Sequence, residues 1–125
     1  MKRQMQMIYN HLEFNQHLNN KKALFINMRN YYTYCCENED VFNTLPLTFH
    51  VKTGTQDQLF AKFKTYFEQQ KQLCSEDKDR KNIWIIKPGE NSITGKGITV
   101  EEELNKITQI VESYCCKDGS RTAIV

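Results

Sequence analysis

The sequence predicts a mixed α/β (α+β) fold, in which an N-terminal helical region precedes a smaller unit of strands and helices. Two observations predict the helices: apolar residues recur at helical spacing over residues 59–73 and again over residues 104–114. A third predicts a strand, because residues 82–87 are mostly apolar at consecutive positions and stop at Pro88-Gly89. We expect this strand to be buried on both faces. A chain of 125 residues suits one folded domain.

Composition excludes several classes of protein. The chain has 17 Lys plus Arg against 15 Asp plus Glu. It therefore lacks the excess of basic residues that is typical of a dedicated nucleic-acid-binding protein. No apolar run approaches the roughly 20 residues of a membrane span, and the N-terminus lacks the apolar core of a signal peptide. The five cysteines are odd in number and show neither C-x-x-C spacing nor a Cys/His cluster at zinc-ligand intervals. We therefore expect a cytoplasmic protein with no membrane, nucleic-acid or metal site, whose thiols pack as small apolar groups.

Residues 1–81 are predicted to be mostly helical, with one short strand. The expected elements are helices over residues 8–20 and 22–34, a polar loop over 36–43, a short strand near 47–51, a helix from about 55 to 73, and a charged loop over 75–81. The strand is expected because the residue before Pro46 is biased toward extended backbone. Thr55 and Gln58 fit a capping box, which predicts the start of the longer helix.

Residues 82–125 are predicted to form a β-loop-β-α-β unit. After the first strand come a glycine-rich loop, a strand over 97–100, a helix to about Tyr114 and a final strand over 121–125. Thr99 and Glu102 fit a second capping box, which would place residues 101–103 in the first turn of that helix, where acidic side chains complement the helix dipole. Because the chain stops within the last strand, we expect a truncated end with an unpaired apolar edge that favours self-association.

The glycine-rich loop is the segment most suited to chemistry. Three of the five glycines lie between Pro88 and Gly97, in the sequence P-G-E-N-S-I-T-G-K-G. Glycine permits positive φ angles and lets successive N–H groups point into one concavity, and Lys87 and Lys96 add positive charge at either end. This pattern favours a nucleotide. The spacing fails both the Walker A and the G-x-G-x-x-G motifs, and a plain glycine hairpin between two strands stays open as an alternative.

Several segments resemble one known family. Residues 82–98, N-I-W-I-I-K-P-G-E-N-S-I-T-G-K-G-I, resemble the nucleotide-binding signature of the tubulin-tyrosine-ligase-like family, which are ATP-grasp enzymes that join amino acids to tubulin. Residues 45–51 resemble the proline-threonine strand of that family, and residues 21–28 resemble the helix ahead of it. Residues 121–125 resemble the start of the strand that leads to the adenine hinge.

The resemblance implies a partial ATP-grasp subdomain over residues 82–125 and a site for ATP with Mg²⁺. Lys87 would reach the ATP phosphates and the adenine edge, and a lid over the phosphates would be formed by Ser92, Gly95, Lys96 and Gly97. Ile93 and Thr94 stand where relatives carry a polar residue and an arginine. The magnesium-binding residues of the family would follow Val125, so we expect no catalytic residue here and no ligase activity from this chain alone.

The resemblance also implies tubulin or microtubules as partners, and the cytoskeleton or cilium as the location. Our first hypothesis is a fragment of an ATP-dependent tubulin ligase of the polyglutamylase or glycylase type. The second is a non-catalytic relative that acts as an interaction or scaffold protein through its unfinished edge strand, and the third is an unrelated small α/β binding module. We interpret His11, His17 and His50 as surface or packing residues, since no nucleophile stands at a telling spacing from them.

Overall fold

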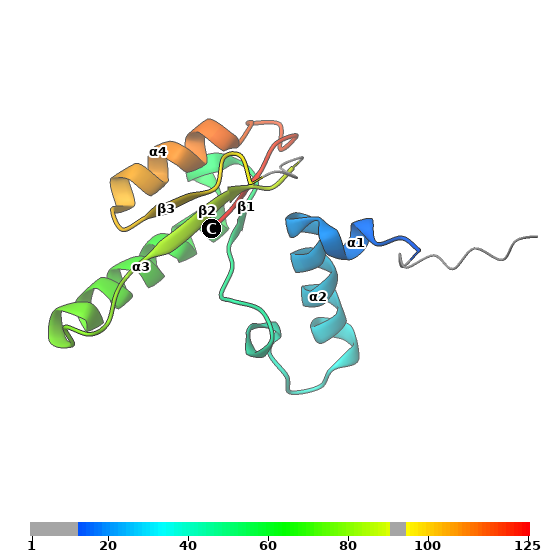
Figure 1. The fold of residues 1–125 in the computed structure, drawn as a ribbon, viewed down its shortest axis with the longest axis horizontal. Coiled ribbons are helices and arrows are strands. Elements are labelled where there is room, and N and C mark those ends of the chain that lie inside the picture. The colour runs from blue at the N-terminus through cyan, green and yellow to red at the C-terminus, as the bar shows by residue number, and fades with distance from the viewer. Residues whose placement is uncertain (1–12, 91–94) are drawn as a thin grey trace, which may run out of the picture.

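The computed structural model describes residues 13–90 and 95–125. They form a small N-terminal helical layer, a four-stranded sheet and two helices that pack on the sheet (Figure 1). In chain order the elements are α1 (Gln16–Asn19), α2 (Lys21–Cys35), the 3-10 turn η1 (Val41–Asn43), β1 (His50–Val51), the 3-10 turn η2 (Gly54–Gln56), α3 (Gln58–Glu76), β2 (Trp84–Pro88), β3 (Thr99–Glu101), α4 (Leu104–Tyr114) and β4 (Ala123–Ile124). The predicted mixed α+β class is confirmed.

The helical layer differs from its prediction at one end. The helix expected over residues 22–34 is confirmed as α2, which starts where the Asn20 side chain accepts hydrogen bonds from the N–H groups of Lys22 and Ala23. The helix expected over residues 8–20 is wrong in its described part, because α1 is a single turn. Phe14 stands just before it at a φ of 57°, in the left-handed region that a continuous helix excludes. Residues 8–12 lie outside the described residues.

All four strands pair antiparallel in the order β1-β4-β2-β3. The predicted β-loop-β-α-β order of the C-terminal unit is confirmed as β2, β3, α4 and β4, with β4 returning between β1 and β2. Successive residues of a strand point to opposite faces of a sheet. The sheet therefore presents Ile86 on one face and Ile85 and Lys87 on the other.

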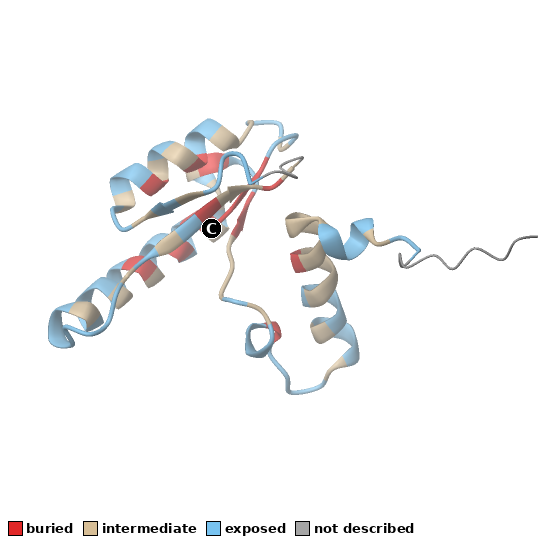
Figure 2. Ribbon diagram, viewed as in Figure 1, coloured by how far each residue is buried: buried red, intermediate tan, exposed pale blue. Residues whose placement is uncertain are grey.

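Helices α3 and α4 close one face of this sheet. Their apolar stripes meet the inward residues of the strands in a single core, which comprises Val51, Phe60, Phe63, Phe67, Ile86, Ile107, Val111, Ala123 and Val125. Figure 2 shows this burial on the strands and on the sheet-facing sides of both helices, whereas α2 buries only Phe25. The two helices that periodicity predicts are confirmed. Across the described residues, no helix has the length and apolar character that crossing a bilayer requires.

The other face of the sheet, which we call the open face, is exposed at the β3 end and buried at the β1 end. Val100, Ile85, Lys87, Ile124 and His50 form a row across β3, β2, β4 and β1 by the strand register. Val100 and Ile85 are 59% and 48% exposed, whereas Ile124 and His50 are 7% and 1% exposed. The expectation that β2 is buried on both faces is therefore wrong. Its consecutive apolar residues alternate between the core and an apolar surface.

The expected unpaired edge at residues 121–125 is also wrong. β4 lies inside the sheet, and the backbones of Phe49 and Val125 exchange two hydrogen bonds of 2.8 and 3.0 Å. Ile124 and Val125 are buried. The partner strand β1 lies more than 70 residues earlier, which a local pattern cannot reveal. This removes the argument for self-association, and for a scaffold role, through that strand.

The capping box predicted for α3 does not form. The helix begins after Asp57, whose carboxylate accepts hydrogen bonds from the N–H groups of Leu59 at 2.8 Å and Lys52 at 2.7 Å. Thr55 lies in η2 instead, where its hydroxyl donates to Glu112 at 3.0 Å. A carboxylate that binds amides on both sides of the turn therefore replaces the predicted hydroxyl cap.

The capping box predicted for α4 is wrong as well. This helix begins after Glu103, which makes no capping hydrogen bond with its side chain, and Thr99 lies in β3. Glu101 and Glu102 precede the helix and do not lie in its first turn. The Thr99 hydroxyl is buried, and no described residue supplies it with a hydrogen-bond partner.

The predicted boundary between residues 1–81 and 82–125 stays a prediction. The sheet combines β1 from the first of these regions with β2, β3 and β4 from the second.

Candidate functional site

Two cavities lie beside α2, one against the open face of the sheet and one against the glycine-rich segment. The first, of about 380 Å³, borders the open face and is mainly apolar; its lining includes Leu24, Phe25, Leu47, Trp84, Ile85 and Ile124, together with Lys21 and Lys87. The second, of about 910 Å³, is lined by Asn19, Asn20, Lys22, Asn27, Gly89, Glu90 and Gly95, among others, and also by Lys21. Lys21 therefore belongs to both cavities, which places an apolar and a polar compartment next to each other at the start of α2.

Lys87 lies at the C-terminal end of β2, on the open face, as the sequence predicts for a strand that ends in lysine. It is half-buried, pairs with Ile124 across the sheet and lines the apolar cavity. No hydrogen bond or ion pair joins the Lys87 ammonium group to any residue that the structure describes. A cation held by a strand beside an apolar cavity is able to bind an anion that carries an apolar group.

The glycines that follow adopt the conformations expected of a backbone cradle. Gly95 and Gly97 have φ angles of 75° and 76°, which side chains rarely adopt. A Cβ on Gly97 would lie 3.2 Å from Pro88 Cγ, and its carbonyl accepts a hydrogen bond of 2.6 Å from the Tyr114 hydroxyl. Gly95 lines the polar cavity, whereas Lys96 is exposed and lines neither cavity. Ser92, like Ile93 and Thr94, lies outside the described residues.

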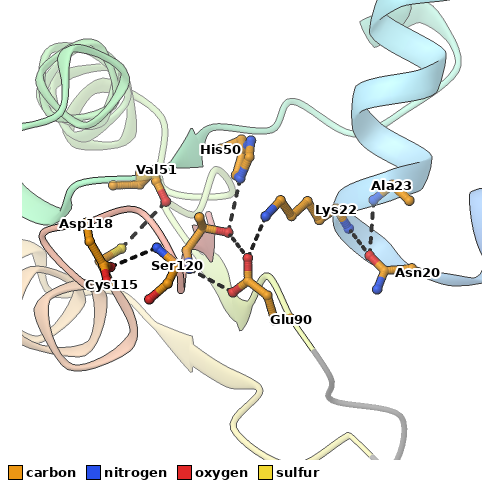
Figure 3. A network of polar contacts seen from close by, with 10 residues as sticks. Asn20, Lys22, Ala23, His50, Val51, Glu90, Cys115, Asp118 and Ser120 are labelled. Carbon is orange, nitrogen blue, oxygen red and sulfur yellow. Dashed lines mark hydrogen bonds and ion pairs between the residues drawn. The ribbon is translucent and has the colours of Figure 1, made fainter.

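A polar network crosses from α2 to the sheet at the start of the glycine-rich segment (Figure 3). Glu90 Oε1 accepts hydrogen bonds from Lys22 Nζ at 2.7 Å and from the Thr122 hydroxyl at 2.8 Å. Its other oxygen, Oε2, accepts the N–H of Thr122 at 2.7 Å. His50 Nε2 lies 3.1 Å from the same Thr122 hydroxyl oxygen. We call these four residues the Glu90 network.

The protonation states in the Glu90 network follow from its geometry. The Thr122 hydroxyl donates its one proton to the Glu90 carboxylate, so its oxygen accepts from His50, which must carry its proton on Nε2. Burial, together with the charges of Lys22 and Lys52, lowers the pKa of His50 from 6.5 to about 4. Burial alone would raise the pKa of Glu90, but hydrogen bonds from Lys22 and Thr122 outweigh it, and the pKa is lowered. The network is thus a neutral histidine beside an ionised carboxylate.

The sequence did not predict the Glu90 network. The residues that bond to one another in it are separated by 32 to 72 positions, and no motif with a fixed spacing joins them. One signal was available, since Lys22 and Glu90 both lie in segments that carry the family resemblance. Neither segment indicates that the two side chains meet.

The described residues contain no group of three His, Cys, Asp or Glu side chains that could hold a metal ion. No Mg²⁺ ligand set is therefore identified within them.

One of three comparisons with known proteins finds a match, and that match covers the whole site. No curated protein and no solved structure matches the chain. The model of the tubulin-tyrosine ligase family, in contrast, matches residues 1–125, which include α2, the sheet and the glycine-rich segment. The helix, strand and glycine segments on which the resemblance depends thus lie within one match, and the chain belongs to the tubulin-tyrosine ligase family.

Proposed function

We propose that this chain binds ATP at the open face of its sheet, in the two cavities beside α2. The observation that carries the proposal is the position of Lys87, a cation with no described partner, at the boundary between an apolar cavity and a glycine-rich segment. ATP has a planar aromatic base, whose faces pack against apolar side chains, and a polyanionic tail. A site for it needs an apolar wall and positive charge close together.

The apolar cavity suits the adenine base. Leu24 and Phe25 border it from α2, while Ile85 and Ile124 border it from the sheet. Its volume of about 380 Å³ lies within the range typical of small-molecule sites. Lys87 also lines this cavity and stands two residues before Gly89 of the polar cavity, so we place its ammonium group toward the phosphates.

The polar cavity suits the phosphates. Gly89 and Gly95 border it from the glycine-rich segment, and Lys22 borders it from α2. Glycines at these positions let an anion approach the backbone N–H groups closely, which a side chain would prevent. Gly97, which is held by Tyr114, would fix the far end of this cradle.

We further propose that the bound ATP serves the joining of glutamate or glycine to tubulin, as in a polyglutamylase or glycylase. ATP supplies the phosphoryl group that activates a carboxylate for attack by an amine. The described residues identify no Mg²⁺ ligands, so no catalytic step is assigned to this chain's side chains.

ATP binding is tested by calorimetry on wild type and Lys87→Ala. We expect the substitution to weaken binding by about tenfold to a hundredfold, since it removes a hydrogen bond to a charged group worth about 1.5 to 3 kcal/mol. The matched control is Lys62→Ala, at an exposed position of α3 on the opposite side of the sheet. Equal affinities for the two variants would contradict the role of Lys87.

The ligase proposal has its own test. Tubulin is incubated with the chain, ATP, Mg²⁺ and radiolabelled glutamate or glycine in separate reactions. Label that enters tubulin from one of the two amino acids, and that is lost with Lys87→Ala, would support the proposal and select between the two types. Label that enters tubulin equally from wild type and from Lys87→Ala would contradict it, whereas no label from either agrees with the expectation that this chain alone has no ligase activity.

A further inference from the structure

The N-terminal helical layer contacts the rest of the protein sparsely. α2 packs mainly on α1 and η1, and its face toward the sheet borders the two cavities. An ion pair of 2.7 Å between Lys22 and Glu90 joins α2 to the residues that follow β2. Tyr32 bonds Thr44 in the connecting segment, and Thr33 bonds within α2, so neither holds α2 against the sheet.

The two ends of this contact are fixed differently. On the sheet side, both Glu90 oxygens are bound by Thr122, whose hydroxyl is supported in turn by the buried ring of His50. Gly89 adds a backbone hydrogen bond of 2.8 Å to the Thr122 carbonyl, and a side chain on Gly89 would collide with Thr122. On the helix side, Lys22 reaches across from the first turn of α2, which Asn20 caps.

We propose that the pair of Lys22 and Glu90 is a latch that holds α2 against the sheet and keeps the proposed nucleotide cleft formed. Glu90 is then a positioning residue: although it lines the polar cavity, it acts by fixing both the start of the glycine-rich segment and the distance of α2 from β2 and β4. The part of this inference that concerns affinity rests on the proposed ATP site. The part that concerns the cleft itself does not.

The latch and simple electrostatics predict opposite effects of Glu90→Gln. This substitution removes a negative charge beside the polar cavity while it keeps the shape of the side chain. If Glu90 acted only through its charge, the substitution would raise the affinity for a polyanion. If Glu90 holds the cleft together, we expect ATP to bind about fivefold or more weakly, the usual lower range for coupling between conformation and binding.

The chain contains its own probe of the cleft. Trp84 is the single tryptophan: its ring packs on Phe63 of the core, and the residue also lines the apolar cavity that α2 borders. Without ATP, we expect acrylamide to quench the Trp84 fluorescence more efficiently in Glu90→Gln than in wild type, because α2 would no longer limit access to the cavity. Lys22→Met, which breaks the latch from the helix side, should have the same effect, and the double variant should add nothing.

The matched control is Glu103→Gln, which breaks the exposed pair of Glu103 and Lys106 away from the cleft. It should leave both quenching and ATP affinity as in wild type, and circular dichroism would verify that all variants are folded. Quenching that rises in both latch variants while wild type binds no ATP would support the latch and contradict the proposed function. Quenching and affinity that stay at wild-type values in Glu90→Gln and Lys22→Met would overturn the latch, even if wild type binds ATP.

Discussion

The two faces of the sheet use the same kinds of residue for different purposes. The face that carries Ile86 is covered by two helices and is buried, whereas the face that carries Ile85 and Lys87 borders cavities and is partly exposed. Both faces are apolar, so hydrophobicity alone does not distinguish a stabilising surface from a binding surface. What distinguishes them is the cation on the open face and the sparse packing of the layer above it.

The largest expected difference between the faces is in stability. Phe63→Ala should destabilise the fold by about 3 to 5 kcal/mol, because it leaves a cavity in the sealed core where this ring contacts Trp84, Phe49 and Phe67. The matched substitution on the other face, Ile85→Ala, should cost about 1 kcal/mol or less. Urea unfolding of both variants measures the difference. Equal losses would mean that the two faces are packed alike.

The second effect concerns the covered end of the open face, where His50 is buried. The histidine is neutral in the fold with a pKa of about 4 against 6.5 unfolded, so the unfolded chain binds a proton first as the pH falls. Stability should therefore decline from pH 6.5 down to pH 4, by about 3 kcal/mol at most. Glu90 and Asp57, whose pKa values are lowered, lose their stabilising effect at still lower pH.

His50→Gln checks this assignment. Glutamine keeps an N–H donor for Thr122 but does not titrate, so urea unfolding at several pH values should show a flatter profile between pH 6.5 and pH 4. A slope as steep as in wild type would show that another group dominates there.

A smaller effect is expected at the turn that joins β1 to α3. Asp57→Ala should cost about 1 to 2 kcal/mol, since the carboxylate caps the helix and also binds the N–H groups of Lys52 and Thr53. Thr55→Ala removes the residue that the sequence indicated as the cap, and it should cost less. Thermal unfolding ranks the two variants, and the reverse order would restore the capping box.

The smallest effect is a gain in stability. The Thr99 hydroxyl is buried opposite Ile86 without a partner among the described residues. Thr99→Val keeps the shape and removes the unsatisfied group, which should stabilise the fold by about 1 kcal/mol. A loss in the denaturation midpoint would indicate that this hydroxyl has a partner after all.

Local sequence patterns predicted which helices and strands form better than they predicted which of these elements pair or pack together. The stripe that contains Phe60, Phe63 and Phe67 identified α3 as a core helix, because helical periodicity is contained within one segment. The burial of β4 was missed, since it depends on pairing with β1. The caps were also missed: Thr55 fits the motif, but the carboxylate of Asp57 reaches more backbone amides.

The candidate site divides in the same way. Lys87, Gly95 and Gly97 could be predicted because they lie in one short segment with a recognisable composition. The bond from Glu90 to Lys22 could not, since it joins residues 68 positions apart that become neighbours only when α2 folds back over the sheet. The exposure of Ile85 could not be predicted either, because a run of apolar residues does not reveal which face of a strand lacks a covering layer.

We propose that ATP binds on the open face of the sheet and not elsewhere on the protein. The most direct test of this proposal is an ATP titration of the isotopically labelled chain followed by nuclear magnetic resonance of the backbone amides. We predict that the largest shifts occur at Ile85, Lys87 and Gly95, with none at core residues of α3 and α4 such as Phe63 and Val111. Shifts confined to α3 and α4, or none on the open face at saturating ATP, would contradict the account.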